Sequence, residues 1–178
     1  IYNGVPAPDK VADTDYLNSL GVEPCKYVFA MGRFVPEKNF HQLIRAFAAL
    51  KQQNYKLVLA GDTDFEDDYS KKLKSLAKEN GVILTGFIKG TKLHELLTHA
   101  RCFVLPSSHE GLPIALLEAM SYDLPVIVSY FQTGNEKQLQ EKLQKNLVQD
   151  FCSVHYFMDE YNWDRIAEQV VSVYRNMF

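Results

Sequence analysis

The chain has 178 residues, of which 47% are hydrophobic and 23% charged, and its 19 Lys and Arg residues nearly balance 22 Asp and Glu residues. A chain of this size can bury a substantial core as one domain, and its composition excludes both a disordered chain and a disulfide-dense scaffold. The slight acidic excess argues against nucleic acid or another polyanion as a general partner, although it leaves room for a local basic cleft.

Residues 1–24 open the chain with Asn3-Gly4, Pro6, Pro8 and several acidic residues. Turn-forming residues of this kind predict a linker, and a short helix is expected near Asp13–Leu20. Five short apolar runs rich in β-forming residues come next and predict strands. These runs are Tyr27–Met31, Lys56–Ala60, Val82–Thr85, Cys102–Leu105 and Pro125–Ser129.

Helical patterns lie between and after these runs. Apolar residues recur at the i, i+3, i+4, i+7 spacing of a helix in 40–50, in 69–77, in 93–100, from Pro113 onward and in 163–177. We expect Asn39 and Thr91 to cap the first and third of these helices, and Asn80-Gly81 to end the second. Strands that alternate with such helices predict an α/β fold, a doubly wound parallel sheet with helices on both faces.

Ligands bind to such a sheet where the C-terminal ends of strands meet loops and helix N-termini. The loops at 32–38, 61–68, 86–90 and 106–113 are therefore the expected location of a site. The first contains Gly32-Arg33 and Lys38, two cations close to a predicted helix N-terminus whose free N–H groups also favour an anion. A diphosphate fits this combination, but spacing alone fits equally well a surface loop in which Lys38 pairs with Glu37 or faces solvent.

The fourth loop reads Pro106-Ser107-Ser108-His109-Glu110-Gly111-Leu112-Pro113 and leads into an apolar helix that contains Glu118. Gly111 permits close approach to the backbone, and Pro113 suits the first turn of a helix. A carboxylate on so apolar a helix costs free energy unless it is hydrogen-bonded, and the paired hydroxyls of a ribose would satisfy it. Spacing alone also fits a plain acid at a helix start for Glu110 and an acid that touches solvent or a lysine for Glu118.

Several blocks stand in a fixed order along the chain: Gly32-Arg33, Glu37-Lys38-Asn39, Gly61-Asp62, Gly86-Phe87, Pro106-Ser107, Glu110 with seven residues before Glu118, and Pro125-Val126-Ile127. Together they resemble the C-terminal domain of the retaining GT-B glycosyltransferases, the large group 1 family. Ile1-Tyr2-Asn3-Gly4-Val5 resembles the link from that family's N-terminal domain, and Trp163–Tyr174 is similar to its closing helix. The resemblance implies a linker at 1–24 and a nucleotide-sugar-binding domain at 25–178, the Rossmann-like half of a GT-B fold.

The resemblance also implies the chemistry: transfer of a sugar from a nucleotide-diphospho-sugar to an acceptor, with retention and without a metal. Arg33 and Lys38 would hold the diphosphate, and preorganised cations there would stabilise its departure in the transition state. Glu118 would bind the ribose hydroxyls, and Glu110 would contact the donor sugar near its anomeric carbon. The rest of the implied donor site comprises Gly32, Gly61, Gly86, Phe87, Ile88, His109, Gly111, Leu112 and Pro113.

We expect no resident cofactor and no metal, because no cluster of acidic residues or histidines suggests a ligand set. His109 either lines the donor pocket or is an ordinary loop residue, and the other histidines are expected in surface or satisfied positions: His41, His94, His99 and His155. Three irregularly spaced cysteines do not form a disulfide framework, so a reducing, intracellular environment is expected. Cys102 lies in an apolar run and is expected to be a small buried hydrophobe.

No run reaches the ~20 apolar residues that a membrane span needs, because Glu118 and Asp123 interrupt the longest one. The chain begins with Ile1, so a preceding segment could carry a targeting signal. Many members of the family build surface polysaccharides or lipid-linked glycans, which implies a cytoplasmic location and allows peripheral contact with the inner membrane face. The family's N-terminal domain would choose the acceptor, whether glycan, lipid or small molecule, so this chain alone is expected to hold the donor without transferring its sugar.

One departure from the family pattern follows the strand that ends at Ser129. The family places there an Asp-x-Pro-Gly loop with another acid, whereas here Ser129 runs into Tyr130–Glu136, which resembles a later strand and the opening of a helix. Either that loop is deleted, or residues 129 and 130 are joined across a missing segment. We favour the missing segment, because a donor-binding loop is a natural place for mobility.

Two other interpretations stay open. A sugar-nucleotide epimerase has a similar two-domain shape, and a non-catalytic module could bind a nucleotide-sugar or a partner protein. The intact set of Arg33, Lys38, Glu110 and Glu118 argues against a degenerate module. A nicotinamide dehydrogenase and a P-loop NTPase are disfavoured because Gly-x-Gly-x-x-Gly and Gly-x-x-x-x-Gly-Lys-Ser/Thr are missing.

Overall fold

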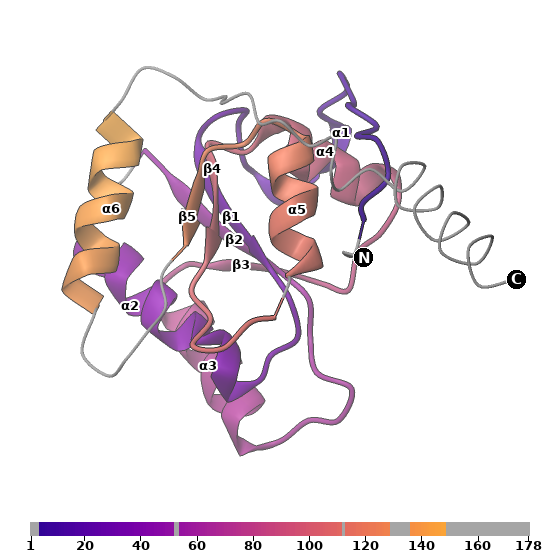
Figure 1. Cartoon of the computed structure of the whole chain (residues 1–178). Coiled ribbons are helices and arrows are strands. Elements are labelled where there is room, and N and C mark those ends of the chain that lie inside the picture. The colour runs from indigo at the N-terminus through magenta and orange to yellow at the C-terminus, as the bar shows by residue number, and fades with distance from the viewer. Residues whose placement is uncertain (1–3, 52–53, 112, 129–135, 149–178) are drawn as a thin grey trace, which may run out of the picture.

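The computed structural model describes residues 4–51, 54–111, 113–128 and 136–148, and these contain one five-stranded sheet (Figure 1). The strands are parallel and lie in the order β3-β2-β1-β4-β5. Their bounds are β1 (Tyr27–Met31), β2 (Lys56–Ala60), β3 (Ile83–Gly86), β4 (Cys102–Leu105) and β5 (Val126–Val128). Each strand coincides with a predicted apolar run to within one residue at either end.

Helices cover both faces of the sheet, which confirms the predicted doubly wound α/β fold. On one face lie α2 (Phe40–Ala49), α3 (Asp68–Glu79) and α6 (Glu136–Val148); on the other lie α1 (Asp15–Leu20), α4 (Thr91–His99) and α5 (Ile114–Ser121). Side chains of the central strand alternate between the two cores: Val28 and Ala30 face the first set of helices, whereas Tyr27 and Phe29 face the second. Both faces are therefore buried, which explains why each strand reads as a nearly continuous apolar run.

The strand order places a topological switch point between β1 and β4. The chain moves from β1 outward to β2 and β3 on one side, and then returns to add β4 and β5 on the other side. At such a point the loops after the two neighbouring strands diverge, and a crevice opens at their C-terminal ends. The loops that begin at Gly32 and Pro106 are therefore the pair that the fold itself selects.

Two helix starts differ from the prediction. Asn39 stands at the N-cap position of α2, but it has a left-handed backbone (φ 51°) and its side chain makes no capping bond. The side-chain amide of Asn39 instead donates to the Glu37 carbonyl at 3.4 Å. Asn39 directly follows the short 3₁₀ helix η1 (Pro36–Lys38), so it links that helix to α2. Gly90 occupies the N-cap position of α4, and Thr91 is the first helical residue. The Asn80-Gly81 ending of α3 is as predicted, with Gly81 in the left-handed region.

The short predicted helix in the opening segment is present as α1, and a buried carboxylate holds it in place. Glu95 of α4 is 3% exposed, and its Oε1 accepts a hydrogen bond from the Leu17 backbone N at 2.7 Å. This bond satisfies a free N–H in the first turn of α1. The side chain of the N-cap residue, Thr14, makes no capping bond to that helix. The opening segment is thereby joined to the second core rather than extending away from it.

Cys102 is fully buried, as predicted, and burial raises the pKa of its thiol to about 12. Within the described residues, no helix is both long and apolar enough to cross a membrane. Several expectations concern residues outside the described ranges: Leu112, Cys152, His155, the closing helix at 163–177 and the junction of residues 129 and 130.

Candidate functional site

The loops after β1, β2 and β3 are joined to one another by backbone hydrogen bonds at the C-terminal edge of the sheet. The Gly32 N–H donates to the Ala60 carbonyl at 2.9 Å, and the Gly61 N–H donates to the Gly86 carbonyl at 2.8 Å. Two residues further along both loops, the Phe34 N–H donates to the Asp62 carbonyl at 2.9 Å. These bonds satisfy backbone groups beyond the ends of the strands and fix the relative positions of three predicted loops.

The fourth predicted loop is joined to the first in the same way. The Ser108 N–H donates to the Glu37 carbonyl at 2.9 Å, and the Ser108 hydroxyl lies 3.3 Å from the same oxygen. Glu37 belongs to η1, the 3₁₀ turn that also carries Lys38. All four loops predicted from the sequence therefore meet at one edge of the sheet.

Gly61 makes the close approach of these loops possible. Its φ of +126° is a conformation that residues with a side chain rarely adopt, and a Cβ built on it would lie 2.0 Å from the Gly32 carbonyl oxygen. No backbone carbonyl can give way by that distance without breaking the hydrogen bonds beside it. Glycine at this position is thus a requirement of the site's geometry.

A cavity of about 290 Å³ opens at this edge. Six of the residues that line it were predicted from the sequence: Gly32, Arg33, Gly61, Phe87, Ile88 and Glu118. Five were not: Met31, Ala60, Leu93, Ile114 and Ala115. Met31 and Ala60 directly precede the predicted glycines, so the strand ends themselves were the signal that could have identified them. Phe87 and Ile114 are large apolar residues left 63% and 49% exposed, and such side chains offer a face for a planar base.

Glu118 projects from α5 into this cavity and is half-buried. Burial raises the pKa of its carboxyl above the ordinary value, and the nearby charge of His94 acts in the opposite direction. No lysine or arginine of the described chain forms an ion pair with it, so the alternative of a lysine-paired acid is not what the structure shows. A half-buried carboxylate in this position is suited to accept hydrogen bonds from a ligand's hydroxyl groups.

The Lys38 side chain lies against Gly32, which lines the cavity, and it binds Glu110: its Cε is 3.6 Å from where a Cβ on Gly32 would stand. The Lys38 Nζ and the Glu110 Oε1 are 2.5 Å apart, and their side chains are only 23% and 11% exposed. The alternative in which Lys38 pairs with Glu37 or faces solvent is therefore wrong. The pair joins the first loop to the fourth, and it places a cation and a carboxylate at one rim of the crevice.

Of the other predicted residues that the structure describes, Gly86, His109, Gly111 and Pro113 do not line the cavity. Gly86 contributes its carbonyl to the bond with Gly61, and Pro113 stands at the N-cap position of α5. His109 and Gly111 are exposed loop residues. Asp62, which the sequence analysis names only in the Gly61-Asp62 block, forms an ion pair with Lys74 at 2.8 Å; the hydrogen bond from Lys74 lowers the pKa of this carboxyl.

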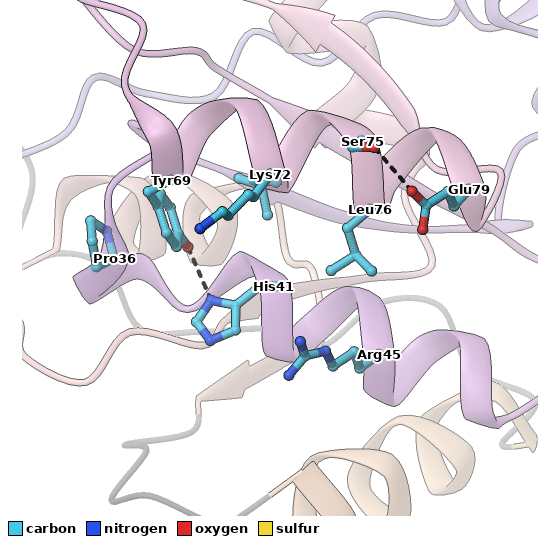
Figure 2. A pocket seen from close by; sticks show the side chains of 9 residues that line it. Pro36, His41, Arg45, Tyr69, Lys72, Ser75, Leu76 and Glu79 are labelled. Carbon is cyan, nitrogen blue, oxygen red and sulfur yellow. Dashed lines mark hydrogen bonds between the residues drawn. The ribbon is translucent and has the colours of Figure 1, made fainter.

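A second, larger hollow of about 650 Å³ lies between α2 and α3 (Figure 2). Its walls are side chains of these two helices, with Pro36 at one end: His41, Arg45, Tyr69, Lys72, Leu73, Ser75, Leu76 and Glu79. His41 and Tyr69 face each other across it and are hydrogen-bonded, with 3.1 Å between the His41 Nδ1 and the Tyr69 hydroxyl. Burial and the charge of Arg45 lower the pKa of His41, and burial raises the pKa of Tyr69 to about 12. None of the predicted site residues lines this groove.

Across the described ranges, no three His, Cys, Asp or Glu side chains gather in a way that could hold a metal ion. The polar groups at the strand-end cavity are instead two cations, two carboxylates and the backbone of converging loops. Cations of this kind bind phosphate oxygens, and a carboxylate accepts hydrogen bonds from hydroxyl groups.

Comparison with known proteins links this geometry to one family. The family description "Glycosyl transferases group 1" matches residues 18–176 of the chain. An uncharacterized glycosyltransferase of Methanocaldococcus jannaschii is 28% identical over 187 aligned residues, which cover 90% of this chain and 48% of that protein. The chain spans less than half the length of the curated relatives it matches.

Solved structures with the same fold include two larger proteins. Sucrose-phosphate synthase from Thermosynechococcus elongatus superposes with a TM-score of 0.78 at 22% identity, over 100% of this chain and 52% of that protein. The HepE protein of Anabaena, solved in complex with UDP-glucose, superposes with a TM-score of 0.71 at 23% identity, over 83% of this chain and 47% of that one. At these identities the likeness shows a shared fold.

Proposed function

Because the chain belongs to the glycosyl transferases group 1 family, we propose that it binds a nucleotide-diphospho-sugar in the strand-end cavity and serves a glycosyltransferase as its donor-binding domain. The observation that carries the proposal is the convergence of four loops at the switch point of the sheet. There Arg33 and Glu118 line one cavity, and the Lys38–Glu110 pair lies at its rim. This arrangement supplies cations for a diphosphate and carboxylates for sugar hydroxyls within a single crevice.

Each group has a distinct role in this proposal. Arg33 and Lys38 bind the diphosphate, Glu118 accepts hydrogen bonds from the ribose, and Phe87 and Ile88 border the base. Glu110, next to Lys38, contacts the donor sugar. When a donor enters the crevice, Lys38 and Glu110 therefore exchange their ion pair with each other for contacts with the donor.

The reaction that fits these groups is transfer of the sugar to an acceptor with retention at the anomeric carbon. The bond between that carbon and the diphosphate oxygen breaks, and its electron pair stays on the diphosphate. An acceptor hydroxyl oxygen forms the new bond to the same face of that carbon, and its proton passes to the departing diphosphate. Positive charge then develops on the sugar ring near Glu110, while Arg33 and Lys38 stabilise the negative charge of the leaving group. The proposed reaction uses neither a resident cofactor nor a metal ion, because the side-chain cations perform the charge stabilisation that a metal would supply.

The complex of HepE with UDP-glucose makes UDP-sugars the first donors to test. Acceptor choice is assigned to a separate N-terminal domain, with a glycan of polysaccharide biosynthesis, a lipid or a small molecule as acceptor. The location that accompanies this proposal is the cytoplasm, with any contact at the inner membrane face made through that other domain.

Calorimetric titration of the chain with UDP-, GDP- and ADP-linked sugars tests the proposal. We expect one nucleotide class to bind, and the Glu118→Gln variant to bind it more weakly. Silence across the whole panel would contradict the proposal and favour a module that interacts with a partner instead. In the full-length protein, a labelled donor separates transfer from epimerisation, because the label reaches the acceptor only in transfer.

A further inference from the structure

The segment at residues 9–11, which precedes α1, is bound by a set of polar contacts to α4 and to the two residues that follow α5. Asp9 makes three of them: its N–H donates to the Tyr122 hydroxyl at 3.0 Å, its carbonyl lies 3.3 Å from the same hydroxyl, and its Oδ2 is 3.2 Å from the His94 Nδ1. We call this set of three residues, Asp9, His94 and Tyr122, the Asp9 clasp. It joins a residue of the opening segment to two helices that follow some 85 and 113 positions later.

Two neighbouring contacts extend the attachment. The Val11 N–H donates to the Thr98 hydroxyl at 3.1 Å, and the Lys10 Nζ lies 2.7 Å from the Asp123 Oδ2. Thr98 follows His94 by one helical turn on α4, and Asp123 directly follows Tyr122. The opening segment is therefore bound along the ends of two helices that both contribute to the strand-end cavity.

Through Tyr122, the clasp adjoins the turn of α5 that carries Glu118. Tyr122 follows Glu118 by one turn, and its N–H donates to the Glu118 carbonyl at 3.3 Å. His94 directly follows Leu93, which lines the cavity together with Glu118. The His94 ring lies 6.3 Å from the Tyr122 ring, and the His94 charge acts on the Glu118 carboxyl by lowering its pKa.

Stability alone does not account for the polar part of the clasp. The side chains of His94 and Asp9 are 30% and 79% exposed, and an ion pair so open to solvent contributes little to stability. Its consequence is geometric: a hydrogen bond to one ring nitrogen fixes the orientation of the imidazole. The imidazole is then held beside the Tyr122 ring, one helical turn after Glu118.

We propose that His94, held by Asp9, is a positioning residue that orients Glu118 for the ribose of the donor. The inference rests on the proposed function, because it assigns the ribose to Glu118. Through the clasp, the segment that precedes the domain is coupled to the nucleoside end of the cavity. A change in the path of residues 9–11 would alter how well Glu118 meets the ribose hydroxyls, without affecting the cations that bind the diphosphate.

The test compares a nucleoside diphosphate with its 2′-deoxy counterpart, by calorimetry on the 178-residue chain. The probe is whichever of UDP, GDP and ADP the unaltered chain binds most tightly. The two compounds share base and diphosphate, so the ratio of their affinities isolates the contribution of a ribose hydroxyl. A general loss of folding lowers both affinities together and leaves the ratio unchanged.

We expect the unaltered chain to prefer the ribonucleotide, and His94→Gln to reduce that preference by about three- to tenfold. Asp9→Asn should move the ratio in the same direction, because it weakens the contact that orients the ring. His99→Gln is the matched control: His99 lies on the same helix and contacts the opening segment through its Nε2, 3.2 Å from the Asp13 carbonyl, but it has no contact with the clasp.

The possible outcomes separate the inference from the function on which it rests. If the unaltered chain prefers the ribonucleotide and His94→Gln keeps that preference, the positioning role is wrong and the proposed function stands. A variant that loses both affinities equally would also overturn the positioning role. If the unaltered chain binds no nucleoside diphosphate, or binds both forms alike, the role of Glu118 fails and the inference fails with it.

Discussion

The strand-end cavity and the α2–α3 groove differ in what builds them. The cavity of about 290 Å³ is lined largely by the ends of strands and the starts of helices, whose backbones are hydrogen-bonded to one another across four loops. The groove is larger, about 650 Å³, yet side chains of two adjacent helices form nearly all of it. Substitutions on the helix surfaces can reshape the groove freely, whereas one added methyl group at Gly61 collides with the backbone of the cavity. The volume of a hollow is therefore a poor criterion for choosing the candidate binding site in this chain. The convergence of backbone segments held by hydrogen bonds is a better criterion.

The largest expected effect comes from adding that methyl group. Gly61→Ala forces a Cβ to within 2.0 Å of the Gly32 carbonyl oxygen, so the loops must separate. We expect the free energy of unfolding to fall by about 2–5 kcal/mol, measured by urea denaturation. Gly81→Ala is the control, because Gly81 also has a positive φ but a Cβ there meets nothing within 4 Å. Equal losses in the two variants would show that the approach of the loops at Gly61 carries no special constraint.

Removing the cation at the rim comes next. In the full-length glycosyltransferase, Lys38→Ala should lower turnover by about 10²–10³-fold, because the departing diphosphate loses a preorganised positive charge. Lys72→Ala removes a cation from the groove instead, and turnover should be unchanged. Steady-state assays with a labelled donor measure both. Turnover of Lys38→Ala within about threefold of the unaltered enzyme would refute the role assigned to Lys38.

Neutralising Glu118 should weaken binding and strengthen folding at the same time. Burial raises the pKa of this carboxyl, so the folded chain holds the proton more tightly than the unfolded chain does. The protonated carboxyl therefore favours folding below its unfolded pKa, and that contribution is lost as the pH rises through the higher folded pKa. Glu118→Gln avoids the cost of burying a charge, so its thermal midpoint should exceed that of the unaltered chain at pH 7.

This advantage should shrink as the pH falls to about 4, where the native carboxyl is itself protonated. At pH 7 the same variant should bind the nucleoside diphosphate about ten- to hundredfold more weakly, because hydrogen bonds to a charged acceptor are lost. Thermal scans at two pH values and calorimetry measure the two effects. The exposed Glu79 of the groove supplies the control Glu79→Gln, which should change neither binding nor the pH dependence of the midpoint. A variant destabilised at pH 7 would contradict the account of Glu118.

The smallest effect is expected in the groove. Tyr69→Phe removes the hydrogen bond with His41, so the free energy of unfolding should fall by about 0.5–1.5 kcal/mol. The affinity for the nucleoside diphosphate should be unchanged. A measurable loss of that affinity in calorimetry would show that the groove belongs to the donor site, and the contrast between the two hollows would disappear.

Most of the fold could be predicted from the sequence because local patterns encode it. Strands buried on both faces leave continuous apolar runs, and the helices leave apolar stripes at their own period. The starts of helices were harder: Asn39 and Thr91 both have suitable capping side chains, yet Asn39 has a left-handed backbone, and Gly90 takes the cap position before Thr91. In both places the path of the backbone decided the outcome, and residue preference did not.

The site was predictable only as far as the ends of strands identify it. Gly32 and Gly61 could be assigned to one edge of the sheet because parallel strands bring their C-terminal ends together. Glu118 was assigned only through the family resemblance, because spacing alone also fits an acid that touches solvent. The partner of Lys38 could not, since Glu110 lies 72 positions away and Glu37 is adjacent. His94 shows the same limit: a helical pattern suggests a surface position, and only the folded chain places it between Asp9 and Tyr122.

Backbone amide chemical shifts, recorded by NMR as a nucleoside diphosphate is added, test most directly where the donor binds. The account predicts the largest changes at the amides of Gly32, Arg33, Gly61 and Ala115, which surround the strand-end cavity. Changes confined to the amides of α2 and α3 that border the groove, with none at those four positions, would contradict it.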